Sequence, residues 1–315
     1  MNQSKKITEG ALLTAIFIVL LFLVLFVPII GTIGLFALPI PFIIYASKHG
    51  FTPALFMLTV AIAISFMIAT AASLPFTIFA GIGGIFIGVA IHRNLSPYET
   101  LARGSLGFIV GFLLIILALQ FLLNINIYYE IDKLITESMN MIRTFIEQTG
   151  VGTSEEQIKL FEDQMNLYKD LLPSSIAIVS LFFAFISQWL SYKILNRMGN
   201  VKRAFPPFKN LNFPVAIIWF YFFALILSLV ELDPSSGLYL VVQNTLALLT
   251  VFVAIQGFSF IFFYADHKKA HKAVPITILI VTLIIPFLFM FIVRIIGIID
   301  LGFSLKERIA NSENK

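Results

Sequence analysis

The chain has 315 residues, of which 59% are hydrophobic and 12% are charged. Globular domains carry about 25% charged and about 45–50% apolar residues, and a water-soluble fold needs polar groups to cover its surface. This composition excludes an ordinary soluble domain and indicates a membrane protein. The chain has no cysteine, which excludes disulfides, thiolate nucleophiles and cysteine-based metal sites. The net charge of +4 is spread over short gaps between apolar runs, as in membrane proteins, so we expect no nucleic-acid partner.

The N-terminal segment resembles a secretory signal, because Lys5 and Lys6 precede an apolar stretch from Ala11 to Ile30. This stretch is longer than a usual signal core, it lacks a convincing A-x-A cleavage site, and further apolar runs follow it. We therefore expect a retained first membrane helix and a cytoplasmic N-terminus.

Apolar runs long enough to cross a bilayer recur along the whole chain. They predict an all-α polytopic membrane protein of about nine transmembrane helices, with a range of about eight to ten, since a bilayer core needs about 20 apolar residues per helix. The predicted helices cover residues 8–29, 32–46, 53–71, 74–91, 102–123, 172–195, 213–230, 237–264 and 274–298. The second is short and is interrupted by Gly31, Gly34, Pro39 and Pro41. We expect helices 1–5 within residues 1–123, an insert over 124–171, helices 6–9 within 172–298, and a polar tail over 299–315.

The basic residues test this path independently. With the N-terminus inside, 13 of the 21 Lys and Arg residues fall in segments that an alternating path places in the cytoplasm, as the positive-inside bias requires. We therefore expect a multi-pass protein of the bacterial cytoplasmic (plasma) membrane, in contact with the lipid bilayer. The C-terminal tail favours neither side, because its charges balance once Asp300 is included.

The insert over residues 124–171 carries nine acids and four bases, and the predicted path places it outside the cytoplasm. Apolar residues at three- and four-residue steps predict an amphipathic helix; they are Ile131, Leu134, Ile135, Met139, Ile142 and Ile146. Gly150 and Gly152 interrupt the pattern, and Thr153 or Ser154 would cap a second helix. We expect a helical hairpin lying over the membrane surface, with a lid over an outward-facing site as the alternative.

Two G-x-x-x-G pairs lie in neighbouring predicted helices, Gly84 with Gly88 in helix 4 and Gly107 with Gly111 in helix 5. Small residues one turn apart let helix backbones approach closely where no hydrophobic drive brings helices together. We interpret both pairs as internal helix packing, with a dimer interface as the alternative.

Polar side chains within the predicted helices are candidates for a substrate site, because their burial in lipid is costly. Gln120 and Asn124 end helix 5 on the outer side, Asn244 lies in the outer part of helix 8, and Arg294 lies near the outer end of helix 9. We expect these four to bind a small molecule at the outer face. The alternatives are amides that bridge helices by hydrogen bonds and an arginine that reaches the interface.

Other polar positions predict no chemistry of their own. Gln188, Trp189 and Tyr192 near the inner end of helix 6 are interpreted as an interfacial belt. His267 and His271 have a spacing that suits a metal, but the lysines around them would repel a cation, and we expect a lipid-headgroup contact instead. The chain has no H-E-x-x-H, G-x-S-x-G or phosphate-loop motif, so we expect no enzyme, no metal and no cofactor. Active transport would need a partner subunit or an ion gradient.

The start of helix 1 carries a small-residue pair, Ala11 and Ala15, within the run from Lys5 to Ala15. This run looks like the start of the substrate-binding (S) components of energy-coupling-factor vitamin transporters, and the likeness extends over roughly residues 5–200 with the Gly-rich fourth helix. The resemblance implies that Ala11 and Ala15 face a transmembrane coupling subunit that works with ATPases. It also implies that the whole subunit reorients in the bilayer.

The whole chain more closely resembles the YybS-like family of uncharacterised bacterial membrane proteins, which are similar to S components. It differs from S components by about three additional helices and by the long insert. The leading hypothesis is therefore a small-solute binding and transport subunit with a separate energising partner. The alternatives are a membrane scaffold that recruits a cytoplasmic or envelope protein and an intramembrane enzyme acting on lipid. That enzyme would need paired acids or a histidine within a span, and no predicted span has either.

Overall fold

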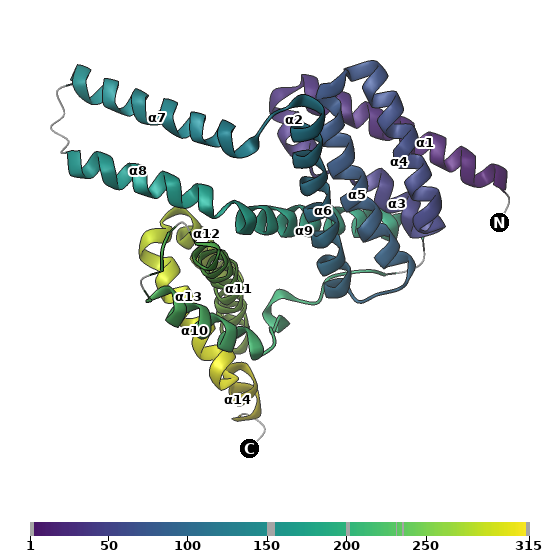
Figure 1. Ribbon diagram of the computed structural model, residues 1–315. Coiled ribbons are helices and arrows are strands. Elements are labelled where there is room, and N and C mark those ends of the chain that lie inside the picture. The colour runs from purple at the N-terminus through teal and green to yellow at the C-terminus, as the bar shows by residue number, and fades with distance from the viewer. Residues whose placement is uncertain (1–2, 150–154, 200–201, 231, 235, 313–315) are drawn as a thin grey trace. The chain divides into compact units, whose positions relative to one another are not determined.

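The computed structural model describes residues 3–149, 155–199, 202–230, 232–234 and 236–312 (Figure 1). Every regular element in these ranges is a helix, so the predicted all-α polytopic membrane fold is confirmed. Within them, seven helices are long and apolar enough to cross a membrane. They are α1 (Gln3–Phe26), α4 (Phe51–Ala69), α5 (Leu74–His92), α6 (Pro97–Leu123), α9 (Leu172–Met198), α11 (Gly237–His267) and α13 (Pro286–Phe303).

The chain forms two compact units. The first comprises Met1–Lys169 and Ser175–Phe205, and the second comprises Asp170–Ser174 and Pro206–Lys315. The boundaries therefore fall near the start of α9 and just after its end, and the short segment Asp170–Ser174 around the start of α9 belongs to the second unit.

Three predicted helices differ from the observed ones, two of them at prolines or glycines. The predicted helix 32–46 is divided into α2 (Pro28–Gly34) and α3 (Ile40–His49), around the glycines and prolines noted above. The predicted helix 213–230 is shorter, α10 (Ala216–Ser228). The predicted helix 274–298 is broken into α12 (Ala273–Ile284) and α13 at Ile285, whose φ and ψ are −123° and 65°. Pro286 has no backbone N–H and disfavours a helical conformation at the residue before it.

The broken segment α2–α3 returns the chain to the end of the first unit where α1 begins. His49 at the end of α3 lies 2.9 Å from Glu9 near the start of α1. The Nδ1 atom of His92, at the end of α5, lies 3.0 Å from the Ser47 carbonyl oxygen. Glycines along α6 contact residues progressively earlier in α5, so the two helices are antiparallel. The end of α6 therefore lies at the other end of the first unit from His92. The first five predicted helices are thus matched by α1, the pair α2 and α3, α4, α5 and α6, and neither α2 nor α3 is long enough alone to cross a membrane.

The insert forms two helices, α7 (Ile127–Thr149) and α8 (Glu155–Asp170), which lie side by side (Figure 1). The expected amphipathic helix is α7. Ion pairs join Lys169 to Asp132 at 2.8 Å and Arg143 to Glu162 at 3.9 Å. The predicted break at Gly150 and Gly152 and the predicted cap at Thr153 or Ser154 lie outside the described residues.

Candidate functional site

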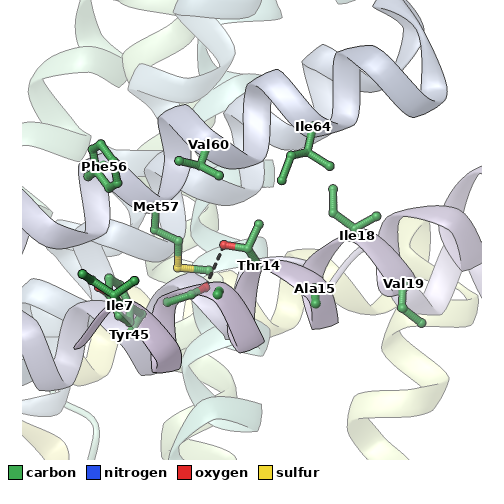
Figure 2. A pocket seen from close by; sticks show the side chains of 12 residues that line it. Ile7, Thr14, Ala15, Ile18, Val19, Tyr45, Phe56, Met57, Val60 and Ile64 are labelled. Atoms are coloured by element: carbon green, nitrogen blue, oxygen red, sulfur yellow. Dashed lines mark hydrogen bonds between the residues drawn. The ribbon is translucent and has the colours of Figure 1, made fainter. Parts of the chain in front are cut away.

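A groove between α1 and α4 contains the alanine pair of the first helix. Ala11 and Ala15 are exposed, and both line a groove of about 610 Å³. Figure 2 shows Met57 and Ile64 of α4 pointing across the groove toward α1. The remaining lining residues are Ile7, Gly10, Thr14, Ile18, Val19, Tyr45, Phe56 and Val60.

The groove offers almost no free polar group. The Thr14 hydroxyl donates a hydrogen bond to the Gly10 carbonyl oxygen at 2.8 Å (Figure 2), and the Tyr45 hydroxyl donates to the Lys6 carbonyl oxygen at 3.2 Å. A Cβ atom added at Gly10 would lie 3.1 Å from the Tyr45 hydroxyl, so the absence of a side chain there lets α1 approach α3. The groove is therefore an apolar surface with small residues on one wall.

A charged cluster joins α1 to α3 beyond Tyr45. A Glu9 carboxylate oxygen lies 2.9 Å from His49 Nε2 and 3.5 Å from Lys48 Nζ. The His49 side chain is fully buried and stacks against Tyr45 with ring centroids 4.7 Å apart. The cluster ties the start of α1 to the end of α3, and it thereby positions the small-residue face of α1 beside α4.

The two glycine pairs face neighbouring helices of the first unit. A Cβ atom at Gly84 would meet the Pro39 carbonyl oxygen of the α2–α3 turn, and one at Gly88 would meet Ala46 of α3. On α6, Gly107 and Gly111 face α5. A Cβ atom at the first would lie 2.6 Å from Phe86, and one at the second would lie 3.3 Å from Phe79.

The four residues predicted to bind a small molecule are divided between the units. Gln120 and Asn124 are exposed at the end of α6 in the first unit, where Asn124 takes a left-handed conformation with φ 54°. Asn244 and Arg294 belong to the second unit. The structure therefore does not bring the four residues together within one unit.

Asn244 and Arg294 have different surroundings. The Asn244 Oδ1 atom accepts a hydrogen bond from the Ser174 amide at 2.8 Å, and its Nδ2 atom donates to the Asp170 carbonyl oxygen at 2.8 Å. This amide thus ties residues 170–174 to α11. The Arg294 guanidinium lies 6.0 Å from the Phe291 ring, and its Nε atom is buried without a hydrogen-bond partner among the described residues.

The predicted belt on α9 is wrong for two of its three residues. Gln188 and Tyr192 are buried and hydrogen-bond to each other at 2.9 Å. Gln188 also donates to the Pro97 carbonyl oxygen at 2.9 Å. Only Trp189 is exposed as a belt residue would be, and its ring lies under the Lys193 ammonium, 3.6 Å from the ring centroid. The prediction is wrong for Gln188 because its face of α9 packs against α6, whereas an interfacial residue would face lipid.

A buried polar network in the second unit was not predicted. Asp300 of α13 accepts a hydrogen bond of 2.6 Å from Gln256 of α11 and another of 3.1 Å from the Lys306 amide. Lys306 lies at the start of α14 (Leu305–Ser312), and its ammonium lies 3.5 Å from the Asp300 carboxylate. Gln256 also accepts from the Phe213 amide at 3.1 Å. Gln256 and Asp300 are 0% and 2% exposed, so a carboxylate is held inside an apolar unit.

Two glycines allow this network to form. A Cβ atom at Gly257 would collide with the Val293 carbonyl oxygen, and one at Gly297 would collide with the Val253 carbonyl oxygen. The backbones of α11 and α13 therefore cross in direct contact. Asp300, three residues after Gly297, reaches Gln256 at this crossing.

The charge of Lys306 depends on its neighbours. Burial lowers the pKa of the Lys306 amine, and the Asp300 carboxylate opposes this shift. Burying an ammonium without a counter-charge is costly, so the carboxylate favours the charged form of Lys306. A sequence signal for this site existed in Gln256 and Ser259, which are spaced i, i+3 in an apolar run around Gly257.

Similarity to known proteins extends over both units. A family model described as "Predicted membrane protein (DUF2232)" matches residues 15–301. The protein described as "Uncharacterized protein YybS" from Bacillus subtilis (strain 168) is 32% identical over 311 residues, which cover 98% of this chain and all of that protein. No solved structure matches this chain.

Proposed function

Since the chain belongs to the DUF2232, or YybS-like, family of predicted membrane proteins, we propose that it is a binding and transport subunit for a small solute in the bacterial plasma membrane. In this proposal a separate transmembrane coupling subunit with ATPases supplies the energy. The observation that carries the proposal is the exposed pair Ala11 and Ala15 in the α1–α4 groove. A catalytic role is not part of it.

The proposed occupant of the groove is a transmembrane helix of the coupling subunit. Both walls are helices long enough to cross a membrane, so an occupant at this depth must satisfy its own backbone polar groups, as a helix does. Small residues on α1 permit the close approach by which helices associate in lipid. A polar solute would find few partners there, because the hydroxyls of Thr14 and Tyr45 already donate to backbone carbonyls.

The solute itself would be captured elsewhere. We propose Gln120 and Asn124 as the solute-contacting residues of the first unit, because they are exposed amides at the end of α6. Asn244 and Arg294 remain candidates in the second unit. The Arg294 guanidinium is the stronger of these two, since it has a buried Nε atom without a partner, whereas Asn244 already holds the α8–α9 junction.

The proposal is tested by purifying the protein from its native membrane after light crosslinking. Coupling and ATPase subunits should co-purify with the wild type and be lost with Ala11→Trp and Ala15→Trp, because an indole would fill the groove. Leu12→Trp is the matched control, since Leu12 is exposed on α1 and does not line the groove. Equal loss with Leu12→Trp, or retention of both subunits with the alanine variants, would exclude docking in the groove.

A scaffold function is the second candidate, and the α7–α8 hairpin favours it. The hairpin carries exposed apolar side chains on both helices, among them Met141, Phe145 and Phe161, and an acidic excess. Such a surface suits an envelope protein with basic and apolar groups. Co-purification of an envelope protein that is insensitive to the alanine variants and is lost when residues 127–170 are replaced by a short linker would support the scaffold.

A further inference from the structure

A pocket of about 340 Å³ lies in the second unit, between the end of α11 and the start of α12. Its third wall is the short 3₁₀ helix Phe208–Asn210, with Pro207 before it. The volume is at the lower end of the range for small-molecule sites. All three walls belong to one compact unit, so the pocket is formed without the first unit.

One part of the pocket lining is apolar. Phe208 and Phe262 meet edge to face, with ring centroids 5.3 Å apart, and Ala265 and Pro275 are buried. Ile276 of α12 also lines the pocket and is exposed. Both flanking helices are apolar, and α11 is long enough to cross a membrane. A lipid chain that leaves the pocket along these helices would therefore enter the hydrocarbon core.

The remaining part of the lining is charged. Lys209 and Asp266 form an ion pair of 2.5 Å, whereas Lys272 lines the pocket without an ion pair to any described residue. Lys268 and Lys269 add two further positive charges in the same loop. The lining thus carries one uncompensated positive charge, at a basic loop that the positive-inside bias places in the cytoplasm.

These charges distinguish between possible ligands. A free phosphate would meet the Asp266 carboxylate as well as Lys272, whereas a phosphodiester carries a single negative charge that matches the uncompensated lysine. A headgroup with hydroxyl groups can also donate to the carboxylate, which only accepts hydrogen bonds when it is ionised. Basic pockets between membrane helices on the cytoplasmic side bind the headgroups of anionic phospholipids. A phosphodiester, hydroxyl groups and acyl chains are together the features of phosphatidylglycerol.

We propose that this pocket binds one phosphatidylglycerol molecule of the cytoplasmic leaflet. The Lys272 ammonium holds the phosphodiester, and the Asp266 carboxylate accepts hydrogen bonds from the glycerol hydroxyls. Lys209 fixes that carboxylate through the ion pair. The first carbons of the acyl chains lie against Phe208 and Ile276. This inference is independent of the partner proposed for α1.

The pocket is distinct from the headgroup contact expected from the sequence. That expectation rested on His267 and His271, and neither histidine lines the pocket. The His267 ring stacks against Phe263 with centroids 6.0 Å apart, and His271 Nδ1 accepts a hydrogen bond from the Ala273 amide at 3.2 Å. The proposed site therefore consists of other residues at the same end of the second unit.

The test is native mass spectrometry of the purified protein, released from detergent that contains increasing amounts of phosphatidylglycerol. The wild type should retain one phosphatidylglycerol with higher affinity than phosphatidylethanolamine or phosphatidic acid. Lys272→Gln should weaken this binding about fivefold, which is the attraction of one lysine for an anionic lipid surface. Lys269→Gln is the matched control, since Lys269 is exposed in the same loop and does not line the pocket. It should leave the affinity unchanged.

Asp266→Asn tests the choice of headgroup. It should abolish the preference for phosphatidylglycerol over phosphatidic acid, because the more highly charged phosphate is no longer repelled. Equal binding of phosphatidylethanolamine and phosphatidylglycerol by the wild type would overturn the proposal, as would equal weakening by Lys272→Gln and Lys269→Gln. Displacement of phosphatidylglycerol by the same concentration of glycerol 3-phosphate would overturn the assignment to a lipid, because a ligand without acyl chains would then suffice.

Discussion

Asp300 is a single carboxylate buried in an apolar unit, and its hydrogen-bond and charge partners decide how much its burial costs in stability. It receives hydrogen bonds from the Gln256 side chain and from the Lys306 amide, and the Lys306 ammonium balances its charge. A buried pair of this kind adds little net stability compared with apolar residues, but removal of one partner is strongly destabilising. The residue is therefore a sensitive position for a test of stability.

Asp300→Asn should lower the free energy of unfolding by about 3 kcal/mol, because Lys306 then loses its counter-charge in a buried position. Thermal unfolding in detergent would measure the change. Asp266→Asn is the matched control. Asp266 pairs with Lys209 at 2.5 Å on the surface, where its side chain is 59% exposed, and exposed pairs contribute only about 0–1 kcal/mol. Equal effects of the two substitutions would contradict a special role for Asp300.

At the residue scale, several polar residues within helices were predictable from the sequence, but their hydrogen-bond partners were not. Asn244 was recognised as an amide within a predicted span, yet its bonds to Ser174 and Asp170 join segments 70 or more residues apart, which no local pattern indicates. Gln256 was missed because the run around it is strongly apolar. Asp300 was assigned to the tail because the predicted last helix ended at residue 298, whereas α13 continues to Phe303.

Helices of this chain end or break where backbone chemistry requires it. Pro28 begins α2 and Pro286 begins α13, both at positions where the missing N–H is harmless. The long apolar runs predicted most of the spans well, because length and composition suffice for that. The break at Ile285 was missed because the apolar pattern continues through Pro286, and only the steric effect of the proline interrupts it.

Gly257→Ala should destabilise the second unit by about 1–3 kcal/mol, because the added methyl group collides with the backbone of α13 and overpacks the crossing. The control is Gly237→Ala at the start of the same helix, where a Cβ atom would meet nothing within 4 Å. That substitution should be neutral or slightly stabilising, since alanine favours helix more than glycine. The unfolding midpoints of the two variants give the comparison. An unchanged midpoint for Gly257→Ala would argue against direct backbone contact between α11 and α13.

Ser96→Ala should cost about 1 kcal/mol of stability through the start of α6. The Ser96 hydroxyl accepts a hydrogen bond from the Glu99 amide at 3.3 Å, and the Glu99 carboxylate accepts one from the Ser96 amide at 2.9 Å. Loss of such a cap leaves helix-terminal donors unsatisfied. Ser105→Ala, which removes only a bond to the Leu101 carbonyl within the same helix, should change the midpoint much less. A larger loss of stability with Ser105→Ala than with Ser96→Ala would contradict the capping role.

At the scale of the whole molecule, hydrogen bonds between distant residues define the path of the chain better than hydropathy does. The contact between Glu9 and His49 shows that α2 and α3 together return the chain to the end of the first unit where α1 begins, although neither helix is long enough alone to be a candidate span. In the second unit, Phe213 and Phe208 contact Gln256 and Ser259. This places the start of α10 toward the His267 end of α11.

The contacts of Lys306 predict the side of the C-terminal tail, which charge alone leaves open. Lys306 of α14 donates to the Leu211 carbonyl oxygen, so α14 returns to the end of the second unit where α10 begins. The basic loop between α11 and α12 belongs to that end as well, and basic loops face the cytoplasm. We therefore expect α14 to lie on the cytoplasmic side.

Because the chain has no cysteine, single cysteines at exposed positions can test this topology with a membrane-impermeant maleimide in intact cells. Gln148→Cys in α7 should be labelled from outside, whereas Ala270→Cys in the α11–α12 loop should be labelled only after the membrane is opened. Ala310→Cys in α14 should behave like Ala270→Cys. Labelling of Ala310→Cys in intact cells would mean that α12 and α13 together make one full crossing and place α14 outside the cell. The hydrogen bond from Lys306 to the Leu211 carbonyl oxygen would then be absent in the membrane.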